Sequence, residues 1–206
     1  MTADPESDQT TEQIIAVSTR LFAQLGFDGA SMRLIGDATG LDAATVTAHV
    51  GSKTDLYRTV VGRAFEAERS AVAGMVGAFT PTWTSMSRLL DAYLDFYAGS
   101  PQIVELWLHR RMGDAADISG LEDVYVRPPF LQIAEALRTE AAVDVDVDYA
   151  IWTIVWLVSG FLSTGIMHST PPDHPHGTHM HRTPEDLEDF RGYLHEIMRR
   201  ILPLPD

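Results

Sequence analysis

The sequence predicts an all-α protein in which a small N-terminal domain precedes a larger helical body, with about nine helices in all. Three observations support this class. Apolar residues recur every three or four positions through most of the chain, which is the period of an amphipathic helix. Glycine and proline separate these segments. The one strand-like alternation, at residues 143–148, is better explained as an acidic lead into a helix that Asp146 or Asp148 caps.

Residues 1–10 are predicted to be a disordered acidic tail, because Asp4, Glu6 and Asp8 stand there among polar residues. The first helix follows, and Gly26 is expected to end it in a left-handed conformation, with Phe27 packing back on the last turn. Its apolar stripe consists of Ile14, Val17, Ser18, Leu21, Phe22 and Leu25.

Two short helices are predicted next. Ser31 is a good N-cap for the first of them, and Gly40 supplies a turn that most residues would enter with strain. Asp42 can cap a third helix of about seven residues, 43–49. A short helix held across a supporting helix by a glycine turn is sized for the DNA major groove. Residues 11–58 are therefore predicted to form a helix-turn-helix domain.

The order of the key residues in this region carries a further signal. In sequence they are Phe22, Gly26, Phe27, Ser31, Gly40, Leu41, His49, Val50, Ser52 and Lys53. This pattern resembles the N-terminal DNA-binding domain of TetR-type transcriptional regulators. In that family a Phe-x-x-x-Gly-aromatic end of the first helix precedes a hydroxyl residue, a Gly-apolar turn, a His-apolar pair and a Ser-Lys helix start. The resemblance covers residues 11–63, about a quarter of the chain.

The resemblance implies DNA-contact roles for Ser31, Arg33, Thr45, Thr47, His49 and Lys53. The serine, histidine and lysine would contact phosphates, the arginine a base edge or a phosphate, and the threonines bases or backbone. Each role has a simpler alternative. Arg33 could be a solvated surface residue, Thr45 an ordinary helix-face residue, and His49 a cap or brace of the recognition helix.

The predicted recognition surface is small and nearly uncharged. Many family members have lysine near position 43 and an aromatic residue at position 47, where this chain has Ala43 and Thr47. Residues 11–63 carry equal numbers of acidic and basic side chains, while the whole chain has a net charge of −14. Few groups that neutralise phosphates predict a shallow salt dependence, and the acidic remainder of the chain should repel DNA.

Residues 59–206 are predicted to form a ligand-binding and dimerisation domain. Its later helices are expected at 82–98, 101–112, 121–139, 148–168 and 184–202. The resemblance implies that the last two of these helices pair with their copies in a second subunit, giving a homodimer. A two-fold dimer presents two recognition helices and reads a near-palindromic DNA operator.

In this family the middle helices usually enclose a small-molecule pocket. The candidate wall residues here are Tyr93, Tyr97, Trp107, Met112, Phe130, Trp152 and Trp156. Aromatic residues at helical spacing usually fill the core, so the alternative is that most of them do only that. The run His109, Arg110 and Arg111 could anchor a polar ligand group, or it could pair with acidic residues of the segment 114–122.

The sequence predicts no catalytic residue, metal site or cofactor. It has no cysteine, which excludes disulfides and thiol catalysis, and no nucleophile or phosphate-loop motif. Five histidines crowd into a His/Pro-rich loop, 168–183: His168, His174, His176, His179 and His181. A mobile connector is the favoured interpretation, and metal sensing is the alternative.

The segment 149–169 has no charged Asp, Glu, Lys or Arg and is long enough to span a bilayer. Its polar residues and the lack of a flanking basic cluster favour a buried helix instead, so no membrane partner is predicted and the expected location is the cytoplasm.

Three functions remain open at this point. The first is a ligand-responsive dimeric regulator, most simply a repressor that an apolar effector releases from DNA. The second is a relative with poor DNA binding that senses a ligand or binds a protein partner. The third is a metal-dependent helical enzyme, for which the chain offers little.

Overall fold

The computed structural model describes residues 5–140, 145–166 and 183–206, and their regular elements are ten α-helices. The all-α prediction is therefore confirmed. The chain divides into two compact units. The first unit comprises the chain up to Ala67 together with Gln102–Arg127, and the second comprises Glu68–Pro101 and Pro128–Asp206. The sequence places this division at residue 58 and assigns all later residues to one domain.

The first helix, α1 (Pro5–Gly29), begins earlier than the sequence predicts. The predicted disorder of residues 5–10 is therefore wrong. Residues 1–4 lie outside the described part of the chain. Proline fits the first turn of a helix, where its missing N–H leaves no bond unmade. One turn further on, the Thr11 hydroxyl donates to the Ser7 carbonyl oxygen at 2.9 Å. The polar composition of this segment is thus that of an exposed helix end.

Gly26 interrupts α1 with φ 71° and ψ 177°. The positive φ is as expected, but the extended ψ differs from a left-handed helix cap, and one more turn follows to Gly29. The backbone N–H of Ala30 donates to the Gly26 carbonyl at 3.3 Å and closes that turn.

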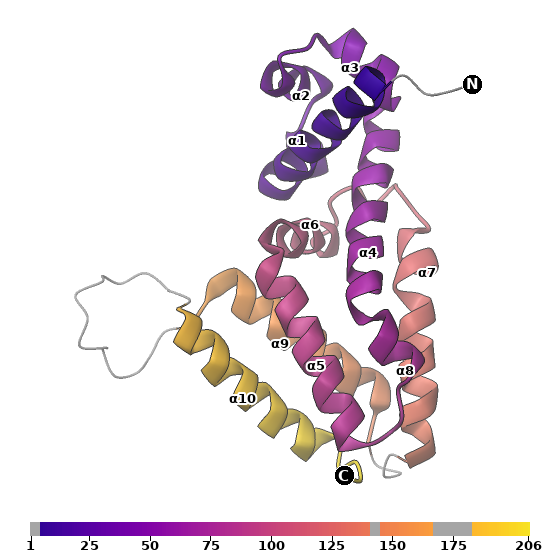
Figure 1. Cartoon of the computed structure of the whole chain (residues 1–206), viewed down its shortest axis with the longest axis vertical. Coiled ribbons are helices and arrows are strands. Elements are labelled where there is room, and N and C mark those ends of the chain that lie inside the picture. The colour runs from indigo at the N-terminus through magenta and orange to yellow at the C-terminus, as the bar shows by residue number, and fades with distance from the viewer. Residues whose placement is uncertain (1–4, 141–144, 167–182) are drawn as a thin grey trace, which may run out of the picture. The chain divides into compact units, whose positions relative to one another are not determined.

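The helix-turn-helix consists of α2 (Met32–Thr39) and α3 (Ala43–Val50), which pack on each other and on α1 (Figure 1). Ser31 caps α2 by accepting from Leu34 N–H at 3.1 Å. Gly40 ends α2 in the left-handed region, with φ 74° and ψ 21°. Asp42 caps α3, so all three predicted signals are confirmed. The fold also depends on Gly36, where an added Cβ would lie 2.6 Å from the Leu41 carbonyl oxygen.

A single apolar core holds the helices of the first unit together. It includes Ile14, Phe22, Ile35, Val46 and Leu56, none of which is exposed to solvent. The rings of Phe22 and Tyr57 meet edge to face with centroids 5.2 Å apart. Since Val46 is the buried residue of α3, the remaining residues of that helix are left for its outer face.

Two further helices belong to the first unit, α6 (Pro101–Arg111) and α7 (Leu121–Tyr125). They pack against the first part of α4 (Lys53–Gly77) through Phe65, whose ring lies 4.2 Å from that of Trp107 and 4.8 Å from that of Tyr125. The sequence predicts one helix over 121–139. Two helices form instead, because the adjacent prolines 128 and 129 suit the first turn of a new helix and cannot continue an old one.

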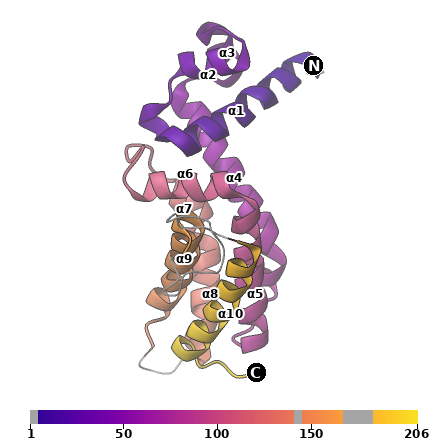
Figure 2. The ribbon, with the colours of Figure 1, turned by 90° about the vertical axis from the view of Figure 1, so that its left-hand side faces the viewer.

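The second unit contains the end of α4, α5 (Trp83–Gly99), α8 (Arg127–Glu140), α9 (Val147–Thr164) and α10 (Pro184–Ile201). Helices α5, α9 and α10 pack on one another (Figure 2). Thr183 and Asp186 form a reciprocal capping box at the start of α10. Gly165, with φ 68°, ends α9 at Thr164, earlier than the predicted 168.

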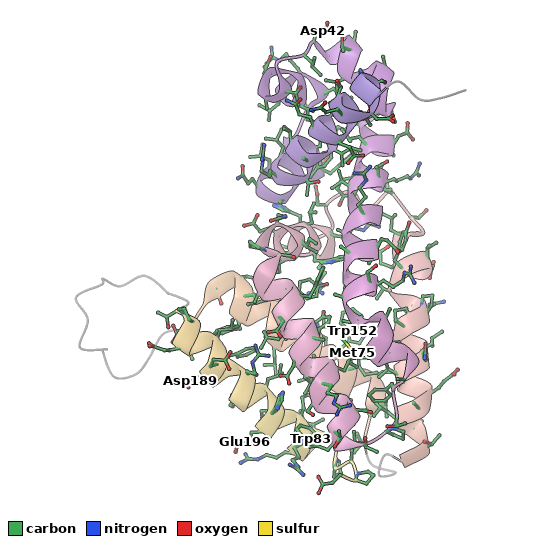
Figure 3. The ribbon with its side chains drawn as sticks, in the orientation of Figure 1. Asp42, Met75, Trp83, Trp152, Asp189 and Glu196 are labelled. Atoms are coloured by element: carbon green, nitrogen blue, oxygen red, sulfur yellow. The ribbon has the colours of Figure 1, made fainter. Side chains whose placement is uncertain are left out.

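Charged groups join α5 and α10 in this unit. Arg191 donates to Asp91 at 3.1 Å and to Asp95 at 2.5 Å, and His195 lies 2.9 Å from the same Asp91 oxygen. Asp189 and Glu196 extend from α10 on the side away from α5 (Figure 3). The buried face of α10 is apolar, as its predicted stripe requires, with Leu194 and Met198 fully buried.

Candidate nucleic-acid interface

The outer face of α3 presents small side chains. Ala44, Thr47 and Ala48 are exposed, while Thr45 and His49 are half-buried. Asp42 at the start of the helix (Figure 3) accepts from Thr45 N–H at 2.8 Å and from the Thr45 hydroxyl at 3.0 Å. The backbone bond from Thr45 is the largest cause that lowers the pKa of Asp42. A carboxylate therefore caps the start of α3, and the helix itself carries no lysine or arginine.

The hydroxyl groups of the predicted DNA-contact residues all have partners within the chain. Ser31 accepts from Leu34 N–H, and the Thr45 hydroxyl donates to Asp42. The Thr47 hydroxyl donates to the Ala43 carbonyl at 2.8 Å. Because this bond turns the Thr47 hydroxyl toward the helix backbone, the methyl group remains as the outward part of an exposed side chain.

Arg33 lies in the first turn of α2, exposed to solvent. Among the described residues it has no hydrogen-bond or ion-pair partner, in contrast to the hydroxyls around it. A free guanidinium has five donors in a forked arrangement, so Arg33 is the side chain of this face that is best prepared to bind an acceptor outside the chain.

Lys53 lies at the start of α4, with its Nζ 4.2 Å from the centroid of the Phe27 ring. Phe27 in turn meets Tyr57 edge to face at 5.0 Å. A cation over an aromatic face is attracted by the ring quadrupole. The ammonium of Lys53 is thus positioned by the core aromatics. Burial raises the pKa of Tyr57 to about 12, so its hydroxyl stays protonated.

His49 contacts the N-terminal part of α1. Its Nδ1 lies 3.1 Å from the Thr11 hydroxyl oxygen. The same region of α1 is tied to α4, because Arg63 donates two hydrogen bonds to Glu12, at 2.5 and 2.7 Å. The bond to Arg63 lowers the pKa of Glu12. Neither contact is predictable from the sequence, since the partners of each stand far apart along the chain.

The loop after α6 supports the break in α1. The carboxylate of Asp114 accepts from Phe27 N–H at 2.6 Å and from Asp28 N–H at 3.2 Å. These N–H groups begin the last turn of α1, and such groups have no partner within their own helix. Asp114 therefore caps that turn from a distant part of the sequence.

Arg110 anchors the same loop. Its guanidinium donates to Glu122 at 2.6 and 3.0 Å and to the carbonyls of Ala115 and Ile118 at 2.8 and 2.6 Å. The pairing alternative for the run 109–111 is thus confirmed for Arg110. The hydrogen bond from Arg110 is the main cause that lowers the pKa of Glu122.

The seven predicted pocket residues do not share one compact unit. Trp107 and Met112 belong to the first unit, and the second unit holds Tyr93, Tyr97, Phe130, Trp152 and Trp156. Met112 is 76% exposed, and Trp156 is 51% exposed. Tyr97 is buried, which raises its pKa well above the usual value. Within this set, the rings of Tyr93 and Tyr97 lie 4.8 Å apart at an angle of 59°, and the rings of Trp152 and Trp156 lie 6.1 Å apart.

A small apolar hollow of about 10 Å³ lies in the first unit. Its lining residues are Val61, Ala64, Leu106, Trp107 and Arg110. That volume is close to the least that one water molecule needs, whereas drug-sized ligand sites measure roughly 300–1,000 Å³. In this conformation the hollow is too small for such a ligand.

The described residues hold no group of three or more metal-ligating side chains. The five histidines of the His/Pro-rich loop lie outside the described part of the chain. Helix α9 is long and apolar enough to cross a membrane by length and composition alone, and 28% of that span is buried within the chain.

Comparison with known proteins adds two findings. Residues 14–60 match the sequence profile of the tetR family of bacterial regulatory proteins. No curated protein sequence matches the chain.

Solved structures with a similar fold span nearly the whole chain. One is the TetR family transcriptional regulator PfmR from Thermus thermophilus, at 18% identity and TM-score 0.64, covering 91% of this chain and 97% of that one. Another is the ketosteroid transcriptional regulator KstR2 of Mycobacterium tuberculosis, at 14% identity and TM-score 0.68, covering 98% and 97%. A third is AibR in complex with isovaleryl coenzyme A and operator DNA, at 14% identity and TM-score 0.69, covering 95% and 99%.

Proposed function

We propose, from the premise that this chain carries the N-terminal domain and the fold of the tetR family of bacterial regulatory proteins, that it is a ligand-responsive dimeric repressor. It would bind a near-palindromic operator and be released by a small, mostly apolar effector. The observation that carries the proposal is the α2–turn–α3 unit, capped at both helix starts, with Val46 buried and the rest of α3 turned outward. The cytoplasm is the proposed location.

In the proposed complex Arg33 makes the main specific contact. Its unpaired guanidinium suits two acceptors on one guanine edge, or a phosphate. Thr47 offers a methyl group, because its hydroxyl is bonded to the Ala43 carbonyl, and a threonine methyl can touch a thymine methyl. Ser31 and Lys53 would bind phosphates, the first at the N-terminus of α2 and the second from the start of α4.

The proposed contact surface has few cations, which supports weak non-specific binding. Arg33 and Lys53 are the two cations proposed at the interface in each subunit, or four in a dimer. Neutralising four phosphates gives a slope of log K against log salt of about −3 to −4. Specific affinity would then depend on dimerisation and shape fit.

Dimerisation is proposed through α9 and α10. Tyr149 and Trp156 on α9 are 66% and 51% exposed, and Tyr193 on α10 is half-exposed. Exposed aromatic residues of this size are typical of protein interfaces. A two-fold contact between these helices and their copies would cover them, and it would present two α3 helices to one duplex.

Effector binding is proposed in the second unit, where Tyr93, Tyr97, Phe130 and Trp152 supply apolar and aromatic surface. One neighbour in fold is a ketosteroid transcriptional regulator, and the apolar skeleton of a steroid supports a mostly apolar effector here. Because the tyrosine pair is well packed, the effector must select a more open conformation. The effector can change DNA-binding affinity only by as much as its own affinities for the closed and the open conformation differ.

A second function is favoured by one specific observation. Residues 11–63 have no net charge, and the hydroxyls of Ser31, Thr45 and Thr47 are bonded within the chain. A relative with poor DNA binding, which acts as a ligand sensor or a protein-interaction module, would show these features.

Selection of duplexes from a random pool at low salt separates the two functions. The repressor enriches a near-palindrome, whose affinity then gives the salt slope. The alternative protein enriches no duplex although it is a folded dimer.

A further inference from the structure

The N-terminal part of α1 precedes the segment 14–60 that matches the family profile. It contributes a two-step hydrogen-bond chain to the recognition helix. The Thr11 hydroxyl lies 2.9 Å from the Ser7 carbonyl oxygen and 3.1 Å from Nδ1 of His49. Among the described residues, Thr11 is the one hydrogen-bond partner of the His49 ring.

The protons in this chain can be counted. A carbonyl oxygen only accepts, and a hydroxyl has one proton. When Thr11 donates that proton to Ser7, its oxygen must accept the second bond, so Nδ1 of His49 carries a proton. A neutral imidazole has one N–H. Nε2 of His49 is then a bare acceptor.

This arrangement opposes the contact that His49 was predicted to make. Phosphate oxygens accept hydrogen bonds, so an unprotonated Nε2 cannot bind one. Two changes would remove the conflict. Thr11 could turn its proton from Ser7 to Nδ1, which breaks one bond of the chain. Alternatively, the ring could take up a second proton, after which both nitrogens donate and every bond is kept.

We propose that Thr11 sets the tautomer of His49 and thereby couples operator binding to the uptake of one proton by each His49. The inference rests on the proposed function, because it requires that the protein binds DNA and that His49 then makes the phosphate contact implied by the family resemblance. Operator affinity then rises as the pH falls from 8 to 6. A phosphate contact carries no sequence information, so the affinity for every DNA sequence should rise by the same factor.

Three carboxylates on the helices around His49 have bonds of their own. On α1, Glu12 is paired with Arg63. On α3, Asp42 binds Thr45, and at the start of α4, Asp55 binds Ser52. Further charged groups on these helices are Asp8, Arg20 and Asp28 on α1, Arg33 and Asp37 on α2, and Lys53 and Arg58 on α4, and none of them is hydrogen-bonded to the ring. The hydrogen bond to Thr11 is therefore the feature that sets His49 apart from a histidine surrounded by solvent.

Two substitutions at one position isolate the hydroxyl. Thr11→Ser keeps the hydroxyl, whereas Thr11→Val keeps the branched shape and removes it. Binding of each protein to the duplex enriched by selection at pH 6 is measured by fluorescence anisotropy at pH 6 and pH 8. A gained charge-assisted bond at each half-site predicts about tenfold or more tighter binding at pH 6 for the wild type and Thr11→Ser. Thr11→Val should change by less than about threefold, and its affinity should exceed that of the wild type at pH 8.

The tautomer itself is read by NMR of the His49 ring nitrogens in the free protein at pH 8. The expected result is a protonated Nδ1 in the wild type and Thr11→Ser and a protonated Nε2 in Thr11→Val. A protonated Nε2 in the wild type overturns the inference. So does an equal pH response of all three proteins, which leaves the proposed function standing. Failure of every protein to bind any duplex at either pH overturns the proposed function together with this coupling.

Discussion

Removing the carboxylate of Asp114 should destabilise the first unit. The Asp114→Ala change leaves the N–H groups of Phe27 and Asp28 without the acceptor that now lies 2.6 and 3.2 Å away. Loss of a helix cap costs about 0.5–2 kcal/mol. Phe27 is half-buried and Asp28 is exposed, so water can replace only the second bond fully. The expected loss is therefore about 1.5–2.5 kcal/mol, with an unpaired buried N–H at the upper end.

The matched control is Asp114→Asn, which keeps one acceptor oxygen and loses the charge. It should lose about half to three quarters as much stability as Asp114→Ala. The two N–H groups bind different oxygens of Asp114, so one bond is lost, and the neutral oxygen that remains binds an N–H group about half as strongly as a charged one. Each kcal/mol corresponds to about 2–4 °C of melting temperature for a chain of this size. Asp114→Ala should thus melt about 3–10 °C below the wild type, as followed by circular dichroism.

Amide hydrogen exchange locates the effect. Protection should fall at Phe27 and along the last turn of α1 in Asp114→Ala, while the amides of α10 keep theirs, because α10 belongs to the second unit. The reasoning is refuted if Asp114→Ala and the wild type melt within 1 °C of each other, with the Phe27 amide equally protected (a threshold of roughly 0.3 kcal/mol).

The other predictions concern packing, pH and assembly. Gly36→Ala should lower the free energy of unfolding by about 2 kcal/mol or more, because the new Cβ would meet a backbone carbonyl at 2.6 Å. Gly74 has open space around it, so Gly74→Ala should raise the free energy of unfolding by about 0.5–1 kcal/mol. Equal denaturant midpoints for the two variants would contradict this. Glu122→Gln should destabilise by about 1 kcal/mol at pH 7. Since the bond to Arg110 lowers the pKa of Glu122 below 4.5, that contribution is present above pH 4.5 and is lost as the pH falls further, so the two unfolding curves should converge in acid. Trp156→Glu should leave the fold intact and give a monomer in analytical ultracentrifugation, and a dimer of unchanged stability would exclude α9 as the interface.

The caps of the helix-turn-helix were predictable from the sequence because they are local. Ser31 and Asp42 each bond a backbone N–H three residues later, and Gly40 takes a positive φ that other residues avoid. Such signals need no knowledge of the rest of the fold. The same is true of Thr183, whose side chain caps the next helix.

The contacts that position the site were not predictable in the same way. The partners of His49, Arg63 and Asp114 stand far from them along the chain. Each pairing depends on how the helices pack, which periodicity alone does not specify. The extension of α1 to Pro5 was missed because an exposed helix end and a disordered tail have the same polar composition.

The roles of the aromatic residues were also not predictable from the sequence. Their spacing identifies helix faces but not what covers each face. Tyr97 is buried, whereas Trp156 and Met112 are exposed. A pattern of this kind is equally suited to a core, a ligand pocket or a subunit interface. The predicted pocket residues therefore remain a proposal.

The most direct test of the central claim is duplex selection with the wild type beside two single-arginine variants. Arg33→Ala removes the free guanidinium of α2, and Arg20→Ala removes an exposed arginine of α1 as the control. The wild type and Arg20→Ala should enrich a near-palindrome. Arg33→Ala should bind that duplex at least about thirtyfold more weakly, from two lost contacts of at least about 1 kcal/mol each. No enriched duplex from a folded wild-type dimer, or equal binding by Arg33→Ala, would contradict the central claim.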